Sequence, residues 1–143
     1  EKLMEYFEAH KKFLEDIKTK FLENKIILCG SSTGAMVQFR EMLAEDSRGK
    51  GNTNLTSAFG IIKNKAVVVP HWNAPNYCSS EWEERFVENH KDKLIITIDE
   101  FTSLFWGENE AKVIGLGKVN IVRDGNIKTY KNGETISNLL LLT

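Results

Sequence analysis

The sequence predicts a single α/β domain with a largely parallel sheet that is flanked by helices and followed by a C-terminal β-hairpin. Two observations support this fold class. Short apolar runs typical of buried strands alternate with helical patterns over residues 2–100, as in parallel sheets that helices cover. The segment after them changes to short alternating stretches separated by turn residues. The chain of 143 residues has the length of one domain.

The N-terminal part of the chain contains two predicted helices, a strand and a loop. Residues 2–22 carry apolar side chains at spacings of three and four, or their sum, which predicts an amphipathic helix. Residues 25–29 (KIILC) indicate a short buried strand, and residues 34–45 return to the helical spacing. Residues 46–54 (DSRGKGNTN) are polar and contain two glycines, so we expect a loop there.

The rest of the chain continues the alternation and then ends in a hairpin. Residues 65–71 (KAVVVPH) and 93–100 (KLIITIDE) predict two strands that are buried on both faces. Between them, residues 80–90 predict a helix with a serine at its N-cap and a glutamate at capping-box distance. Residues 112–134 contain the turn signals DGN and NGE between alternating stretches, which predicts a β-hairpin.

Composition and charge exclude several classes of function. The formal net charge is −1, which gives no electrostatic reason for binding nucleic acid or an anionic membrane. No apolar run approaches the length that a membrane-spanning helix needs. Two cysteines are too few for a disulfide framework or for a zinc site made of cysteines. We therefore expect reduced thiols, a cytoplasmic protein and no metal ion.

The stretch GSSTG, residues 30–34, joins a predicted strand to a predicted helix. Strand, G-x-S-x-G and helix in this order form a nucleophile elbow, in which the serine projects from a tight turn. Ser32 has the serine position, and the N–H of Thr33 would face a developing oxyanion. A Walker-type phosphate loop needs a lysine after the second glycine, and a dinucleotide loop needs a third glycine, so neither fits. An inert serine–glycine turn is the alternative that this pentapeptide leaves open.

A serine nucleophile needs a histidine base and a carboxylate that orients the base. His71 directly follows an apolar strand, so it emerges at the sheet edge where open α/β folds place their sites. His10 and His90 lie in helical patterns, where a structural or solvated histidine is the simpler interpretation. The next apolar strand ends at Asp99 and Glu100, and periodicity alone does not choose between these two acids. Three strand ends thus offer a serine, a histidine and an acid.

Four segments resemble the dipeptidase E and cyanophycinase family of serine peptidases, in the same order: ILCGSSTGAM, VVVPHW, ITIDEFTSL and VIGLGKVNIVRDGNIKTYKNGE. The resemblance covers about residues 17–137. It implies a class I glutamine amidotransferase-like fold, which is a flavodoxin-like arrangement. It also implies that Ser32 is the nucleophile, His71 the base and Glu100 the acid. In α/β-hydrolases, by contrast, the acid precedes the histidine along the chain.

The sequence departs from the family pattern at three points. Thr33 replaces the alanine that usually follows the nucleophile. The arginine-rich run that often follows the P-H-F motif is missing, and Arg85 alone matches its last arginine as a substrate-binding residue. The family's N-terminal strands and their glycine-rich loop, which usually supplies a second oxyanion donor, have no counterpart before Glu1. We therefore expect residues 1–143 to be the C-terminal portion of a longer peptidase domain.

These observations together predict a serine hydrolase, namely a peptidase that acts on a small peptide or on an amide bond next to an acidic residue. Two alternatives stay open: a binding or scaffold module that keeps the fold without activity, and an esterase or amidase with the same triad. The expected partner is a small peptide substrate, with no cofactor, no metal and no nucleic acid. An exposed sheet edge would also allow a homodimer, although nothing in the sequence fixes the oligomeric state.

Overall fold

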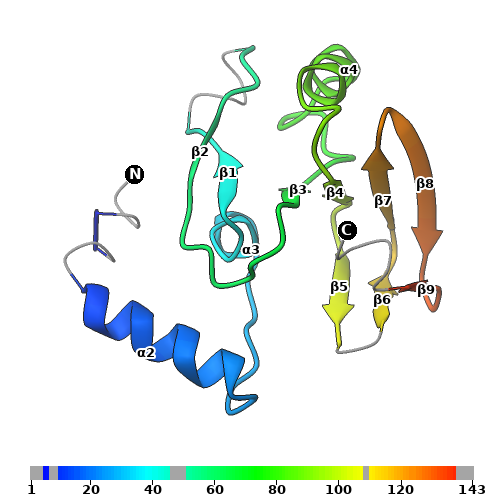
Figure 1. Ribbon diagram of the computed structural model, residues 1–143. Helices are drawn as coiled ribbons and strands as arrows, with labels where there is room; N and C mark the ends of the chain where they lie inside the picture. Colours follow the sequence, from blue (N-terminus) through cyan, green and yellow to red (C-terminus); the bar gives the residue numbers. More distant parts are fainter. Residues whose placement is uncertain (1–4, 7–9, 46–50, 108–109, 138–143) are drawn as a thin grey trace.

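The computed structural model describes residues 5–6, 10–45, 51–107 and 110–137 (Figure 1). Within these ranges the helices are α2 (Lys11–Leu22), α3 (Thr33–Met36) and α4 (Ser80–Asn89). The strands are β1 (Glu41–Leu43), β2 (Leu55–Ser57), β3 (Val67–Pro70), β4 (Ile95–Ile98), β5 (Thr102–Trp106), β6 (Glu110–Gly115), β7 (Lys118–Arg123), β8 (Asn126–Lys131) and β9 (Thr135–Ser137). The predicted α/β class is therefore confirmed.

The central sheet is mixed, which corrects the prediction of a largely parallel sheet. Its strands lie in the order β3-β4-β7-β8, and only β3 and β4 are parallel. Strand β7 runs antiparallel to both β4 and β8. Two parallel strands need a crossover segment, usually a helix, between them. The chain between β4 and β7 instead forms the antiparallel pair β5–β6, so β7 returns in the opposite direction.

Different elements pack on the two faces of the central sheet. Helices were predicted on both faces, and among the described residues they are observed on one face only. On the first face, the sheet residues Val67, Val69, Ile95 and Val122 share a core cluster with residues of α3, β1 and α4, among them Trp82 and Phe86. On the second face, the sheet packs against the three-stranded sheet β5-β6-β9 through side chains such as Val68, Ile96, Ala111, Val113 and Ile136. The domain thus has three layers, and β5–β6–β9 takes the place of a second helical layer.

Several predicted elements are confirmed. Strands β3 and β4 are buried on both faces, as their apolar runs predict. Helix α4 begins after Ser79, whose Oγ accepts a hydrogen bond from the N–H of Trp82 at 3.2 Å. The hairpin predicted over 112–134 exists as β7–β8, with Asp124 and Gly125 at its turn in positive φ. The helix predicted over 2–22 is observed as α2, while residues 2–4 and 7–9 lie outside the described residues.

Two predictions before and after the GSSTG stretch are wrong. Residues 25–29 form no strand: they are extended, with Leu28 packed on the core and Ile27 81% exposed. No described strand pairs with this segment, and a strand without a partner has no hydrogen-bonded ladder. The helix predicted over 34–45 ends at Met36, and β1 follows it. One long helix, or a short helix followed by a turn and a strand, can each bury Met36, Phe39 and Met42. The spacing of the apolar residues could therefore not separate the two.

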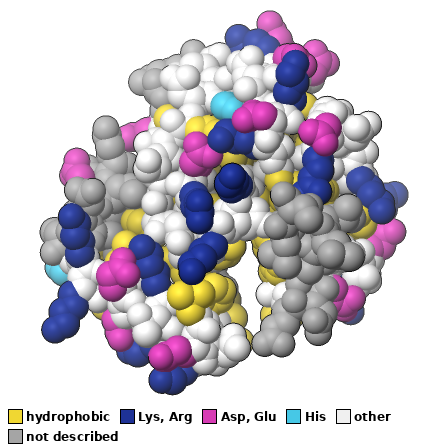
Figure 2. All heavy atoms as spheres, viewed as in Figure 1, with side chains coloured by type: hydrophobic (Ala, Val, Ile, Leu, Met, Phe, Trp, Pro, Cys, Tyr) yellow, Lys and Arg dark blue, Asp and Glu magenta, His cyan; other side chains and the backbone are white. Residues whose placement is uncertain are grey.

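The surface shows no dominant charge of one sign on the face that Figure 2 presents. Lys and Arg side chains are interspersed there with Asp and Glu, as the net charge of −1 leads one to expect. Among the helices that the described residues form, none has the length and apolar character needed to cross a membrane.

Candidate active site

Ser32 lies at the sharp turn that leads from the extended segment into α3. It immediately precedes the first helical residue, and its backbone has φ 52° and ψ −124°. For a residue with a side chain this conformation costs on the order of 1–3 kcal/mol, and such strain is concentrated at functional sites. Ser32 is half-buried, whereas its neighbour Ser31 is exposed. The turn therefore has the strained backbone that a nucleophile elbow requires, although no strand precedes it.

Gly30 makes this turn possible because the chain folds back on itself there. A Cβ atom at Gly30 would lie 2.1 Å from the carbonyl oxygen of Gly34 and 2.3 Å from Nε2 of Gln38. The same Nε2 donates a 2.9 Å hydrogen bond to the Gly34 oxygen. Any side chain at Gly30 would break this contact. Steric hindrance therefore explains why the first residue of GSSTG is a glycine.

His71 owes its place to the parallel pairing of β3 and β4. Pro70, the last residue of β3, lies opposite Ile98, the last residue of β4. The N–H of Trp72 donates to the carbonyl oxygen of Ile98 at 3.1 Å, which holds the chain beyond the strand end. His71 lies between these contacts with φ 60°. Its side chain thus emerges at the carboxyl edge of the parallel pair, as predicted.

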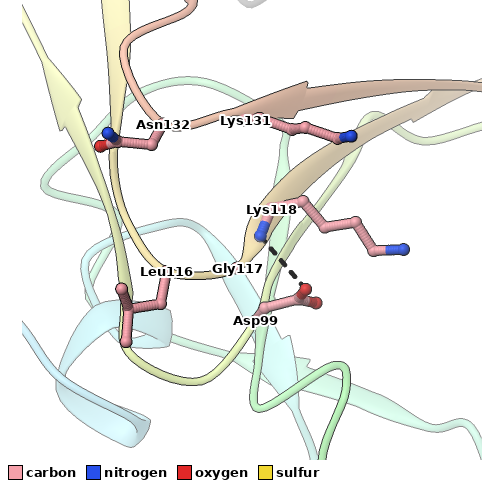
Figure 3. A pocket seen from close by; sticks show the side chains of 6 residues that line it. All are labelled: Asp99, Leu116, Gly117, Lys118, Lys131 and Asn132. Atoms are coloured by element: carbon pink, nitrogen blue, oxygen red, sulfur yellow. Dashed lines mark hydrogen bonds between the residues drawn. The ribbon is translucent and has the colours of Figure 1, made fainter.

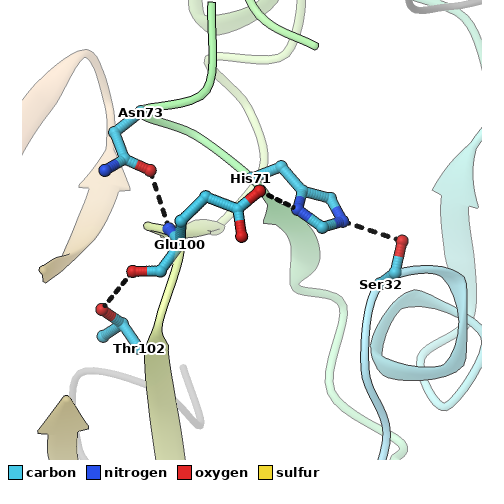
Figure 4. A network of polar contacts seen from close by, with 5 residues as sticks. All are labelled: Ser32, His71, Asn73, Glu100 and Thr102. Atoms are coloured by element: carbon cyan, nitrogen blue, oxygen red, sulfur yellow. Dashed lines mark hydrogen bonds and ion pairs between the residues drawn. The ribbon is translucent and has the colours of Figure 1, made fainter. Parts of the chain in front are cut away.

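The structure brings Ser32, His71 and Glu100 together in one hydrogen-bonded row (Figure 4). Nε2 of His71 lies 2.9 Å from Oγ of Ser32, and Nδ1 of His71 lies 2.7 Å from Oε1 of Glu100. The side chains of His71 and Glu100 are 19% and 35% exposed, so both are partly shielded while solvent still reaches the row. A neutral imidazole in this arrangement donates its Nδ1–H to the carboxylate and offers Nε2 to the hydroxyl.

The backbone of Glu100 is held from two directions (Figure 4). Its N–H donates to Oδ1 of Asn73 at 2.7 Å, and its carbonyl oxygen accepts a 3.0 Å hydrogen bond from Oγ1 of Thr102. The Thr102 oxygen in turn accepts from the N–H of Gly117 at 2.9 Å. Asn73 and Thr102 were not predicted as site residues. Their roles depend on loop geometry after the strand ends, for which the sequence carries no periodic signal.

Asp99, the alternative acid, lies apart from this row. Its Oδ2 accepts from the N–H of Lys118 at 3.1 Å, and its side chain is 5% exposed. Burial raises the pKa of the Asp99 carboxyl above its ordinary 3.8, although the hydrogen bond and charge of Lys118 act to lower it. Burial also raises the pKa of Glu83 on α4, and the charge of Asp99 adds to that effect.

Asp99 also lines a surface pocket, which Figure 3 shows. The other residues that line this pocket are Leu116, Gly117, Lys118, Lys131 and Asn132.

The backbone N–H of Thr33 is a candidate oxyanion donor. Among the described residues it has no hydrogen-bond partner, whereas the next N–H, of Gly34, donates to the carbonyl oxygen of Ser31 at 2.8 Å. The Thr33 N–H directly follows the strained residue Ser32 in the chain. A free N–H next to a nucleophile is the group that stabilises a developing oxyanion in acyl transfer.

Arg85 is not brought to the row of Ser32, His71 and Glu100. It is exposed on α4, and its Nη2 donates to the carbonyl oxygen of Gly51 at 2.7 Å. No contact between Arg85 and these three residues occurs in the described part of the chain.

The ring of Tyr77 is stacked on the imidazole of His71. Sequence reasoning missed Tyr77 because it lies in an irregular loop.

The two remaining histidines are used elsewhere. Nδ1 of His10 lies 2.6 Å from the carbonyl oxygen of Tyr6, and Nε2 of His90 lies 2.6 Å from that of Thr53. Across the described ranges, no group of three His, Cys, Asp or Glu side chains has the arrangement of a metal site. Among the described residues, the row of Ser32, His71 and Glu100 is therefore the group of side chains whose arrangement best suits catalysis.

Comparisons with a family model, a curated protein and a solved structure show what this chain is similar to. The model of peptidase family S51 matches residues 2–114. A cyanophycinase from Geminocystis herdmanii (strain PCC 6308) is 31% identical over 124 residues, which are 83% of this chain and 44% of that protein. The crystal structure of a peptidase from an acI-B1 Actinobacterium superposes with a TM-score of 0.56 at 29% identity, over 74% of this chain and 43% of that one. The chain thus spans less than half the length of either protein.

Proposed function

This chain belongs to peptidase family S51, and from that premise we propose that it acts as a serine-type peptidase with Ser32, His71 and Glu100 as its catalytic triad. The observation that carries the proposal is the hydrogen-bonded row of these three side chains, with contacts of 2.9 and 2.7 Å. The strained backbone of Ser32 supports it further. The finer fold assignment, a class I glutamine amidotransferase-like domain, is part of the same proposal.

The proposed reaction begins with attack of the Ser32 oxygen on the carbonyl carbon of the peptide bond. His71 takes the hydroxyl proton at Nε2 as the C–O bond forms, and Glu100 stabilises the resulting imidazolium through Nδ1–H. The Thr33 N–H donates to the negatively charged oxygen of the tetrahedral intermediate. The C–N bond then breaks, and His71 returns the proton to the leaving amine. Water, activated by the same histidine, hydrolyses the acyl-enzyme ester and restores Ser32.

The proposed substrate is a small peptide with an acidic residue next to the cleaved bond. This part rests on the family resemblance rather than on a contact within the chain. In this structure the guanidinium of Arg85 donates a hydrogen bond to the carbonyl oxygen of Gly51. A role for Arg85 in binding the carboxylate of the substrate therefore stays a prediction. Substituting Arg85 by Gln should raise KM for an aspartyl dipeptide and leave an uncharged dipeptide unaffected.

Labelling with a fluorophosphonate tests the nucleophile. We expect the wild-type chain and Ser31→Ala to be labelled and Ser32→Ala to be unlabelled, since the hydroxyl of Ser32 lies at hydrogen-bond distance from His71. Labelling that persists in Ser32→Ala, or its absence from the wild-type chain, would contradict the proposal. Ser31→Ala is a matched control because it removes the neighbouring hydroxyl from the same turn.

Turnover of substrates then separates the remaining alternatives. A peptidase should hydrolyse members of a dipeptide library, and this hydrolysis should be lost in Ser32→Ala. An esterase or amidase with the same triad would turn over simple esters or amides and spare the dipeptides. A binding module would bind peptides without releasing products and without consuming the fluorophosphonate.

A further inference from the structure

Tyr77 lies flat against the imidazole of His71. The two ring centroids are 4.6 Å apart and the ring planes differ by 17°. We propose that Tyr77 is a positioning residue for the base. Its ring fixes the orientation of the imidazole plane between Ser32 and Glu100 and stabilises the imidazolium formed during catalysis. This inference rests on the proposed function, because it assumes that His71 accepts the proton of Ser32.

The loop after β3 is built to return Tyr77 to the histidine. The N–H of Ala74 donates to the carbonyl oxygen of His71 at 3.2 Å, and the N–H of Tyr77 donates to that of Ala74 at 2.8 Å. These two consecutive turns bring the chain back over its own start. Trp72 and Cys78, on either side, both pack on the core cluster that α4 covers. The stack therefore has a rigid support although Tyr77 itself is 49% exposed.

The hydrogen bonds of His71 alone leave one motion free. Both contacts, to Ser32 and to Glu100, lie at ring nitrogens, so the imidazole can still tilt about the line that joins these atoms. A tilt turns the nitrogen lone pair away from the serine hydroxyl, and hydrogen bonds weaken steeply when misaligned. A ring stacked on one face blocks the tilt in that direction. Tyr77 is the described side chain whose ring is stacked on this face.

The stack also suits the charged form of the base. When His71 takes the serine proton, the imidazole becomes a cation whose face lies over the electron-rich face of an aromatic ring. This attraction is absent from the ground state, in which the imidazole is neutral. Because it strengthens as the proton moves, it accelerates the chemical step rather than binding. Neither effect requires the phenol oxygen. We therefore expect Tyr77→Phe to preserve both effects.

The test compares Tyr77→Phe and Tyr77→Leu in fluorophosphonate labelling of the full chain. We expect Tyr77→Leu to lower the maximal labelling rate about three- to tenfold with an unchanged inhibitor constant, since a stacked cation contributes on the order of 1 kcal/mol. Tyr77→Phe should restore the rate to within about twofold. A residue needed only for folding would lower the thermal midpoint instead, so circular dichroism of each variant is recorded in parallel.

The chain contains a matched control in a second histidine–tyrosine stack. The ring centroids of Tyr6 and His10 lie 4.2 Å apart, with a 21° angle between the ring planes, on the segment that leads into α2. Tyr6→Leu removes this stack and should leave the labelling rate unchanged. With only three histidines in the chain, NMR of labelled histidine reports both stacks directly. The ring signals of His71 should move in Tyr77→Leu, and those of His10 in Tyr6→Leu.

The outcomes distinguish this inference from the proposed function. If Ser32 is labelled in the wild-type chain and Tyr77→Leu reacts at the same rate while its His71 signals have moved, the positioning role is wrong and the triad stands. The role is also overturned if Tyr77→Phe is as slow as Tyr77→Leu. If the wild-type chain is not labelled at Ser32, the proposed function fails first and the inference falls with it.

Discussion

Nδ1 of His71 lies 2.7 Å from Oε1 of Glu100, although 29 positions separate the two residues in the sequence. The parallel register of β3 and β4 produces this contact, because Pro70 and Ile98 end their strands side by side. Glu100 then needs one intervening residue, Asp99, to turn toward the histidine. The hydrogen bond from the N–H of Glu100 to Oδ1 of Asn73 fixes that turn. A sheet edge thus converts a large sequence separation into a short and directed hydrogen bond.

The choice between Glu100 and Asp99 leads to the first prediction. Glu100→Gln should slow labelling of Ser32 by about 10²-fold or more, because a neutral amide stabilises neither the required tautomer nor the imidazolium. Asp99→Asn should retain most of the rate, since Asp99 contacts the backbone of Lys118 rather than His71. The labelling rate constant of both variants is the measurement. The opposite ranking would assign the role of the acid to Asp99.

The two glycines of GSSTG give a second prediction from one matched pair. Gly30→Ala should lower the free energy of unfolding by about 2 kcal/mol or more, because its Cβ would collide with the backbone oxygen of Gly34. Gly34→Ala should be neutral or stabilising by up to about 1 kcal/mol, since nothing lies within 4 Å of the added carbon and alanine favours the helix. Urea denaturation of both variants decides the matter. Equal losses of stability would mean that the turn is packed differently.

The strained backbone of Ser32 gives a third prediction. At φ 52° and ψ −124°, glycine is relaxed and any residue with a Cβ is strained. We therefore expect Ser32→Gly to be about 1 kcal/mol more stable than Ser32→Ala, although neither variant should react with a fluorophosphonate. Urea denaturation measures the difference, and the alanine variant controls for loss of the hydroxyl. A glycine variant less stable than the alanine variant would refute the strain.

The positions of the candidate site residues were easier to locate from the sequence than the pairing of the strands around them. A run of β-branched residues predicts a strand that is buried on both faces, as observed for β3. The residues that follow the end of such a strand must lie at the edge of the sheet. His71 and the pair Asp99 and Glu100 could therefore be located from local patterns, whereas the choice of Glu100 came from the family resemblance. The direction of β7 could not, because pairing direction depends on the connection between strands rather than on the composition of a strand. The sequence after β4 contained no helical pattern, and this was the available sign of an antiparallel return.

The region that follows Ser32 was mispredicted for a related reason. Met36 ends α3, Phe39 lies in the following turn and Met42 lies in β1, and all three are buried. Their spacing fits one continuous helix equally well. Tyr77 and Asn73 had no signal of this kind. Their contacts with the site arise from tight turns after β3, where each hydrogen bond depends on the previous one. Periodicity reports burial on a regular element, and it carries no information on such turns.

The last prediction concerns the dependence of stability on pH. Burial raises the pKa of Asp99 above 3.8 in the folded chain, so the folded state holds this proton more tightly than the unfolded state does. The free energy of unfolding therefore receives a contribution that is complete below the unfolded pKa and is lost as the pH rises through the folded pKa. Asp99→Asn removes this dependence, because an amide does not titrate.

We expect the stability of the wild-type chain, relative to Asp99→Asn, to fall as the pH rises from the ordinary carboxyl pKa of 3.8 through the raised pKa of the folded chain. Urea denaturation at several pH values across this window measures it, and a relative stability that stays constant or rises would contradict the burial of an ionised carboxyl. Glu83→Gln should show a change of the same sign, because burial and then the charge of Asp99 raise the pKa of Glu83. Since each acid raises the other's cost of ionisation, the double variant should lose less pH dependence than the two single variants lose together.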